Sequence, residues 1–364
     1  MVSRVIYATP KLTKEIRSRL AELDALRAQL GDRTGVASPW LGQIRRQAQA
    51  STARSSVLIE GYVVSERESL EIVGGHSAPS EGDDDRSALA AYAHAMDHVG
   101  AMAEDPSFRW LDRVILDLHF DCCSFQRDKR PGRWRTGGVQ VTAAGDGPPL
   151  YVGPDADAVP GLMVEVAEWL EHGDLDAHVV VRAAMAHLHV VTVHPFADGN
   201  GRTSRIVQSL VLARAGVLAP ELGSIEEYLQ AHTSAYYDAL ARTQGGRYQP
   251  SRSARDWVAF CVEAHLDQAR SRLALITDAG ARWSRLEELV EERGWPDRLV
   301  IALEQSLFEG TDRQRYHREA GVAEVTATGD LRRLLDAGLV RQEGQTRNIR
   351  YLATDALRRV AAAT

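Results

Sequence analysis

An apolar segment that leads into a glycine-rich, charged loop limits what this chain can fold into more than any other feature. Residues 179–193 are almost entirely apolar, and His-Pro-Phe-Ala-Asp-Gly-Asn-Gly-Arg-Thr-Ser-Arg follows at 194–205. The pattern predicts a helix, a tight loop containing Gly199 and Gly201, and a second helix that starts near Arg202. Glycines permit positive φ and let backbone N–H groups approach an anion, and the second helix directs its positive dipole end at the same place. The sequence therefore predicts an anion-binding loop.

The charged side chains of this loop favour a polyphosphate as the anion. Arg202 and Arg205 are three residues apart and share a helix face. Asp198 supplies a carboxylate through which Mg²⁺ could bridge to phosphates. His194 lies at the rim, and an unperturbed histidine with a pKa near 6.5 suits a general base. These parts predict transfer of a phosphoryl or nucleotidyl group to a hydroxyl.

The twelve residues also resemble the Fic family signature, HPFx[D/E]GNGRxxR, with every defined position filled. The resemblance implies a helical core that transfers AMP from ATP, with Mg²⁺, to Tyr, Ser or Thr hydroxyls of proteins. Whether the chain itself is among the targets stays open. It assigns the proton acceptor to His194, the Mg²⁺ carboxylate to Asp198, the anion hole to Gly199, Asn200 and Gly201, the β- and γ-phosphate contacts to Arg202 and Arg205, and a core anchor to Phe196.

A second segment resembles the family's PGxxR stretch. It reads Pro-Gly-Arg-Trp-Arg-Thr at 131–136, and glycines and short β-prone pieces follow it to residue 153. The resemblance implies a hairpin flap that aligns a target protein by strand addition, through Val139, Gln140 and Val141. A surface hairpin of purely structural role is the alternative.

Four further residues match family positions. Tyr236 and Tyr237 match a stretch near the adenosine pocket, although an apolar helix face explains them nearly as well. His119 and His187 match as well, and we interpret both as packing histidines.

The stretch Ser-Val-Leu-Ile-Glu-Gly at 56–61 resembles the family's inhibitory motif, [S/T]xxxE[G/N]. Ser56 and Glu60 are four residues apart, hence on one helix face, and Gly61 is suited to end the helix. The resemblance implies that Glu60 forms a salt bridge with Arg205 and denies it to the γ-phosphate. Some family members use this glutamate to remove AMP as well, and the sequence leaves that activity open.

The remaining pattern predicts a mainly α protein. We divide it into an N-terminal helical region (1–105) with the inhibitory helix at about 45–61, a Fic core with a β-hairpin flap (106–276) and a C-terminal winged helix (277–364). The last expected helix of the core covers 254–276.

The C-terminal part reads as helices over 298–308, 312–320 and 325–337 followed by strands at 339–341 and 348–352, the order of a winged helix. Its expected recognition helix carries Arg332 and Arg333, and the wing carries Arg341, Arg347 and Arg350. Acidic residues dilute this charge, so the electrostatic criterion for DNA binding is not met. DNA binding and a protein–protein role such as homodimerisation both remain open.

Composition limits the cellular compartment and the partners expected for this chain. The net charge of −7 argues against wholesale coating by nucleic acid, and three cysteines cannot form a disulfide framework. No apolar run is long enough to span a bilayer, and the N-terminus lacks the apolar part of a secretory signal. We therefore expect a cytoplasmic protein without a membrane partner.

Three functions are compatible with these features. The leading one is an autoinhibited protein adenylyltransferase. A DNA-binding regulator with a nucleotide-sensing Fic core is the second, although a pure sensor would not need His194 as a base. The third is a Fic-fold transferase that uses another nucleotide.

Overall fold

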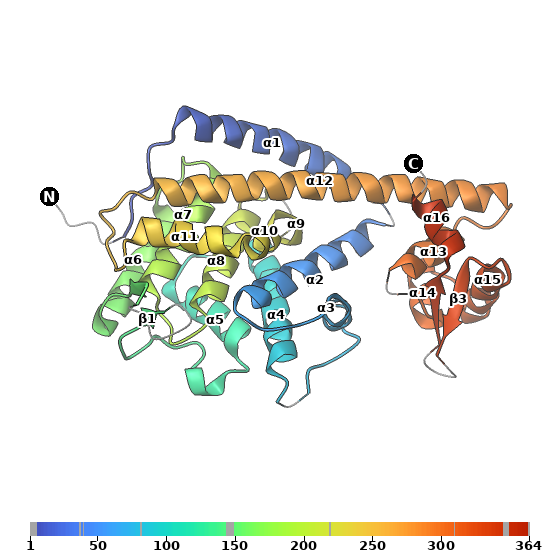
Figure 1. Ribbon diagram of the computed structural model, residues 1–364, viewed down its shortest axis with the longest axis horizontal. Coiled ribbons are helices and arrows are strands. Elements are labelled where there is room, and N and C mark those ends of the chain that lie inside the picture. The colour runs from blue at the N-terminus through green and yellow to red at the C-terminus, as the bar shows by residue number, and fades with distance from the viewer. Residues whose placement is uncertain are drawn as a thin grey trace. The chain divides into compact units, whose positions relative to one another are not determined.

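The computed structural model describes residues 6–35, 38, 40–80, 82–142, 149–217, 220–308, 310–344 and 349–362, with the side chains of 220 and 221 left aside. The chain is mainly helical, as predicted (Figure 1). The α-helices are α1 (Lys14–Thr34), α2 (Leu41–Ile59), α3 (Glu66–Val73), α4 (Asp84–Glu104), α5 (Asp112–Cys123), α6 (Val159–His172), α7 (Val179–Val193), α8 (Asn200–Arg214), α9 (Pro220–Gly223), α10 (Glu226–Ala231), α11 (Thr233–Gln244), α12 (Arg255–Glu292), α13 (Leu299–Leu307), α14 (Arg313–Ala320), α15 (Glu324–Asp336) and α16 (Asp355–Ala362). Two antiparallel pairs of strands, β1 (Gln140–Val141) with β2 (Tyr151–Val152) and β3 (Val340–Glu343) with β4 (Arg350–Ala353), complete it, along with the short 3-10 turns η1 (Arg127–Lys129) and η2 (Ala156–Ala158).

The chain forms two compact units. The first comprises residues 1–31 and 48–271, and the second comprises 32–47 and 272–364. These bounds differ from the three-part division predicted from the sequence, which stays a prediction. Helix α2 begins in the second unit and, from residue 48 on, belongs to the first.

Helices α7 and α8 form the centre of the first unit. Nearly every residue of α7 is buried. In α8, twelve of the first thirteen residues are buried as well. A helix that is apolar on all sides is stable only where neighbours cover it all round. The loop between these two helices, which holds the motif, is therefore anchored at both ends in the core.

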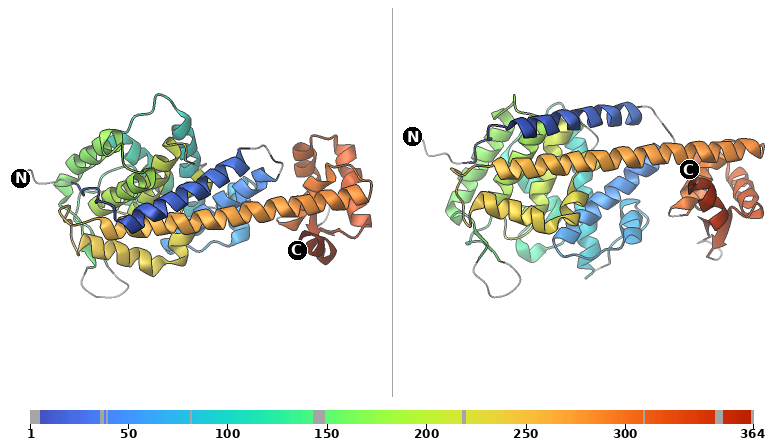
Figure 2. Two further views of the ribbon diagram at one scale, coloured as in Figure 1. Left: turned by 90° about the horizontal axis from the view of Figure 1, so that it is seen from above. Right: turned by 45° about the horizontal axis from the view of Figure 1, so that its top comes forward.

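Helix α1 lies alongside the first part of α12, and the views of Figures 1 and 2 agree on this. Arg19 forms an ion pair with Glu263, and Arg270 pairs with Glu22. Both pairs are partly exposed, so they guide the pairing of these helices more than they stabilise it.

The predicted hairpin has its strands at Gln140–Val141 and Tyr151–Val152, and residues 143–148 between them lie outside the described part. The outer edge of β2 is covered, because the Val152 N–H donates to the Gly246 carbonyl and the Tyr248 N–H donates to the Val152 carbonyl. The outer edge of β1 is therefore where a further strand can pair.

The second unit has its own apolar core, with α13, α14, α15 and the β3–β4 hairpin in the predicted order. Expected wing residues 345–348, including Arg347, lie outside the described part. One expected boundary is wrong: α12 continues past residue 276 to Glu292. Its extension buries Trp283, Leu286 and Val290 in the second core, which gives those turns a reason to stay helical.

Candidate active site

The predicted base lies at the end of α7, where the backbone turns sharply. His194 adopts a left-handed conformation (φ 50°, ψ 58°) and is partly buried. Its Nδ1 lies 3.1 Å from the Val191 carbonyl. A carbonyl only accepts, so Nδ1 carries the proton and Nε2 presents its lone pair. Burial, more than any nearby charge, lowers the pKa of His194 below its usual value, which keeps the ring neutral at pH 7.

The loop is closed from within by Asn200. Its side-chain Oδ1 accepts from the Phe196 N–H and its Nδ2 donates to the Phe196 carbonyl, both at 2.9 Å. The same amide was predicted to line the anion hole, and here it holds the loop in shape. Phe196 is fully buried, as expected of an anchor.

His119 clamps the loop from outside. Its ring stacks on Phe196, with centroids 3.6 Å apart. Its Nδ1 accepts from the Gly132 N–H at 2.9 Å, so Nε2 carries the proton that it shares with the Asp198 carbonyl at 3.0 Å. Burial lowers its pKa to about 4, which keeps this arrangement neutral. His119 is therefore more than a packing histidine, because it joins the motif loop to the PGxxR segment.

Both the backbone conformation at residue 199 and the atoms around it require a glycine there. Its φ is +76°, and a Cβ there would come within 2.3 Å of the Cys123 Sγ, which is buried. Gly216 has a similar φ of +65°, but a Cβ added there would meet nothing within 4 Å. Substituting Gly216 therefore tests backbone strain alone, whereas substituting Gly199 tests backbone strain and steric overlap together.

We expect Gly199→Ala to lower the free energy of unfolding by about 3 kcal/mol, from positive φ and overlap together. Gly216→Ala, the matched control, should cost about 1 kcal/mol from positive φ alone. Chemical denaturation of both variants measures the difference, and removing the sulfur in Gly199→Ala/Cys123→Ala should recover part of the loss. Equal losses for the two single variants would contradict this account of Gly199.

The side chain of Asp198, which the sequence predicts to bind the metal ion, is held in place by hydrogen bonds and stays accessible. Its Oδ1 accepts from the Gly199 N–H at 2.7 Å, its Oδ2 accepts from Gln126 Nε2 at 2.8 Å, and its side chain remains 39% exposed. The described residues contain no group of three potential metal ligands. A single accessible carboxylate fits Mg²⁺, which takes one or two protein carboxylates and completes its shell with phosphates and water.

The segment 56–61, which resembles the inhibitory motif, meets the second arginine of the loop. Arg205 is almost fully buried and donates from Nε to Ser56 Oγ at 2.9 Å, and from NH2 to the Ser56 carbonyl at 3.1 Å and to Glu60 Oε1 at 2.9 Å. Burial alone would lower the pKa of Arg205, but Glu60 raises it above its usual range. Its remaining nitrogen, NH1, has no partner among the described residues.

The Glu60 carboxylate lies over the start of α8. A Cβ on Gly201 would come within 2.4 Å of Glu60 Oε1 and 3.2 Å of Arg205 NH1. A carboxylate thus occupies the position where the glycine, the helix N-terminus and an arginine converge. This is the predicted anion site, and its occupant is an acidic side chain of the same chain.

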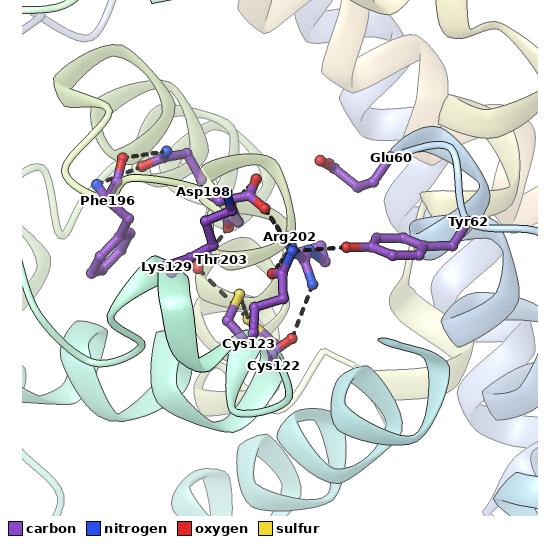
Figure 3. A network of polar contacts seen from close by, with 12 residues as sticks. Glu60, Tyr62, Cys122, Cys123, Lys129, Phe196, Asp198, Arg202 and Thr203 are labelled. Atoms are coloured by element: carbon purple, nitrogen blue, oxygen red, sulfur yellow. Dashed lines mark hydrogen bonds and ion pairs between the residues drawn. The ribbon is translucent and has the colours of Figure 1, made fainter. Parts of the chain in front are cut away.

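Arg202 does not share these contacts. It is 1% exposed and donates to the Cys122 carbonyl at 3.2 Å and to Gln126 Oε1 at 2.9 Å, with Asp198 Oδ2 3.7 Å away. The rings of Tyr62 and Phe125 lie 5.5 Å from its guanidinium carbon. Figure 3 shows this network of polar contacts with Glu60 above it.

Gln126 joins the Asp198 carboxylate to the segment that follows α2. Its Nε2 donates to Asp198 Oδ2 and, at 3.0 Å, to the Tyr62 hydroxyl. Neither residue was a sequence candidate. Tyr62 lies two residues after Glu60, and this closeness in the sequence could have identified it as a candidate site residue. Gln126 has no comparable feature in the sequence around it.

The flap is tied to the base by Arg135. Its N–H donates to the Pro195 carbonyl at 2.9 Å and its Nε donates to the His194 carbonyl at 2.8 Å. NH1 and NH2 hold the Gly137 and Pro154 carbonyls at the two roots of the hairpin. The expected flap residues Val139–Val141 are therefore fixed beside His194.

The two tyrosines matched to the adenosine pocket differ in exposure. Tyr236 is 1% exposed and its hydroxyl lies 3.1 Å from His187 Nε2, whereas Tyr237 is 45% exposed. Their rings are 5.1 Å apart. Tyr237 is thus the one whose ring surface a ligand can reach.

Comparisons with known proteins agree with the geometry. Residues 110–212 match the model of the Fic/DOC family. A curated relative, "Protein adenylyltransferase Fic" of Drosophila willistoni, is 30% identical over 254 residues, which are 68% of this chain and 47% of that protein. The homologue of that name from Aedes aegypti is 29% identical over 62% of this chain and 43% of its own length. The chain thus spans about half the length of the curated relatives it matches.

A solved structure gives the same fold. The crystal structure of a Fic family protein from Desulfovibrio desulfuricans covers 95% of this chain and 98% of its own, with a TM-score of 0.62 and 20% identity.

Proposed function

Because residues 110–212 form a Fic/DOC-family domain, we propose that this chain is a protein adenylyltransferase that moves AMP from ATP to a hydroxyl of a protein. The observation that carries the proposal is the complete motif loop, in which a neutral His194 stands beside an anion site at the start of α8. A nucleotide sensor would need the anion site but not the histidine.

The reaction uses the chain's own groups as follows. His194 Nε2 accepts the proton of the target hydroxyl, whose oxygen forms a bond to the α-phosphorus of ATP. The bond between that phosphorus and the oxygen leading to the β-phosphate breaks, and pyrophosphate leaves. The N–H groups at the start of α8 and the guanidinium of Arg205 stabilise the phosphate charge.

Asp198 would hold Mg²⁺, which neutralises phosphate charge when bound. Its carboxylate is accessible, and Gln126 and the Gly199 N–H fix its two oxygens in place.

Autoinhibition is part of the proposal. The carboxylate of Glu60 and the terminal phosphate of ATP compete for Arg205, and both cannot be held at once. The 2.9 Å contact between Glu60 and Arg205, together with the position of Glu60 over Gly201, supports this reading. The resting chain is then the inhibited form.

The test is incubation of purified full chain with α-labelled ATP and Mg²⁺, using Glu60→Gly to relieve inhibition. We expect label on protein, and mass spectrometry should find AMP on a hydroxyl of the chain or of an added lysate protein. γ-Labelled ATP is the control, because it labels protein only in a phosphoryl transfer. Label from γ-ATP alone would replace the proposal with a kinase-like reaction.

The pH dependence of the released enzyme should reflect a histidine with a lowered pKa. The base works only when neutral, so activity is lost as pH falls through the pKa of His194. Burial lowers that pKa, and the acid limb should therefore lie below pH 6.5. The measurement is kcat of Glu60→Gly between about pH 5 and 8. An acid limb above pH 7 would contradict a buried neutral base.

For the second unit we propose a winged helix. The order of α13, α14, α15 and the β3–β4 hairpin supports it. On the expected recognition helix α15, Asp330 is buried and accepts from Arg298 and from the Tyr316 hydroxyl, while Arg332 and Arg333 are exposed. Asp330 thus stabilises the unit and does not offset the charge of the exposed arginines.

Among the described residues, no helix has both the length and the apolar character that crossing a membrane requires.

A further inference from the structure

Basic side chains gather on the segment that leads from α5 into the flap. Arg127, Lys129, Arg130 and Arg133 are all exposed, and Asp128 is the sole acidic residue in 127–133. The chain as a whole carries a net charge of −7, so this concentration is opposite in sign to the rest of the protein. Among the described residues, Arg130 and Arg133 have no acidic partner, whereas Lys129 pairs with Asp128 at 3.3 Å.

These side chains border a hollow of about 230 Å³. It is lined by Lys129, Arg130, residues 133–139 and Ala197 of the motif loop. Its members include three basic residues of the cluster, Lys129, Arg130 and Arg133, and the ring of Trp134. A hollow of this size holds one or two side chains rather than a nucleotide.

The hollow has a firm base. Trp134 lies against the buried Phe196, with ring centroids 5.2 Å apart. Arg130 donates from NH1 to Thr136 Oγ1 at 3.1 Å. Arg135, next to Trp134, holds the His194 carbonyl at 2.8 Å. The hollow is therefore fixed to the same loop as the proposed base.

The open edge of the flap begins where the hollow ends. The carbonyls of Val139 and Val141 accept from Gly153 and Leu150 on the β2 side. The alternation of a strand then turns the N–H and carbonyl of Gln140 to the outer edge of β1. A target segment paired there advances about 3.3 Å per residue, so residues close to the modified hydroxyl reach the basic side chains.

We propose that this surface, Arg127–Arg133 with the hollow beside it, selects target segments that carry a Glu or Asp close to the modified hydroxyl. The inference rests on the proposed function and deepens it. Main-chain pairing at β1 accepts almost any sequence, whereas Arg130 and Arg133 favour a carboxylate and reject a basic side chain. An acidic target would otherwise be repelled by the net negative chain.

The test uses three fluorescent peptides that share one central Tyr, one Thr and an Ala/Gly background, and that carry Glu, Ala or Lys at the flanking positions. Anisotropy measures their binding without ATP, and α-labelled ATP measures their modification, both with Glu60→Gly. We expect the Glu peptide to bind and react about fivefold better than the Ala peptide, and the Lys peptide to do worse. The preference should shrink as salt is raised.

Charge reversal identifies the surface. Arg130→Glu/Arg133→Glu should invert the order of the three peptides, whereas the matched double variant Arg332→Glu/Arg333→Glu, with the same charge change in the second unit, should keep it. Modification of the chain by itself reports separately on the proposed activity. Self-labelling with no flank preference, or an order that survives the reversal at 130 and 133, would overturn the inference and leave the activity standing. Absence of all labelling with the binding order intact would overturn the activity alone.

Discussion

His194→Asn in a Glu60→Gly background should lower AMP transfer by about a thousandfold, the contribution that a positioned general base makes. In the proposed reaction Nε2 of His194 is the proton acceptor, because Nδ1 is engaged with the Val191 carbonyl. Asparagine suits this position since it tolerates the left-handed conformation that His194 adopts at φ 50°. The measurement is the rate of incorporation of α-label.

The control for this variant is nucleotide binding. The shorter asparagine side chain does not enter the anion site, so the Kd for ATP should change by no more than about twofold. His194→Ala should lose as much activity and also some stability, because alanine is strained in the left-handed region. Transfer within tenfold of the parent in His194→Asn would remove His194 from the role of base.

Glu60→Gly alone should raise AMP transfer about thirtyfold or more. The expected size follows from losing a partly buried, charge-assisted contact to Arg205, which shifts the balance between closed and open forms by that factor. Ser56 keeps its own bonds to Arg205, so the arginine stays in place when the carboxylate is gone. Initial rates at an ATP concentration well below saturation measure the gain, because saturating ATP would itself displace Glu60 from Arg205.

Two further variants separate relief of inhibition from loosening of the fold. Glu60→Gln keeps the size and helix preference of the side chain but loses its charge, and should give a smaller gain of the same sign. Glu104→Gly, at the exposed end of α4, places the same substitution where it touches no site residue and should leave the rate unchanged. A gain in Glu104→Gly equal to that in Glu60→Gly would make flexibility, not the lost contact, the cause.

The sequence predicted the parts of the site whose chemistry is local. The loop at 194–205, its two helices and the turn glycines follow from spacing and residue type, and the hairpin follows from glycines within a helical chain. The contact of Glu60 with Arg205 was expected from the resemblance, and the structure has these side chains 2.9 Å apart.

What the sequence missed depends on long-range packing. Gln126 meets Asp198, 72 residues away, because α5 happens to end beside the motif loop. The sequence predicts only a packing role for His119, because ring stacking and hydrogen bonds to the backbone leave no pattern in the neighbouring sequence. The extension of α12 likewise depends on which core receives its apolar face, and that is decided by the whole fold.

Under the proposed autoinhibition, the position of Glu60 in the same chain as Arg205 has a consequence for how the enzyme responds in a cell. An inhibitor that is tethered acts at an effective concentration set by the fold, which dilution or overproduction of the protein does not alter. Activity per molecule is then independent of how many copies are present. Apart from ATP, which competes for Arg205, an event that acts on α2 would change it, and the first turns of that helix, up to residue 47, belong to the other compact unit.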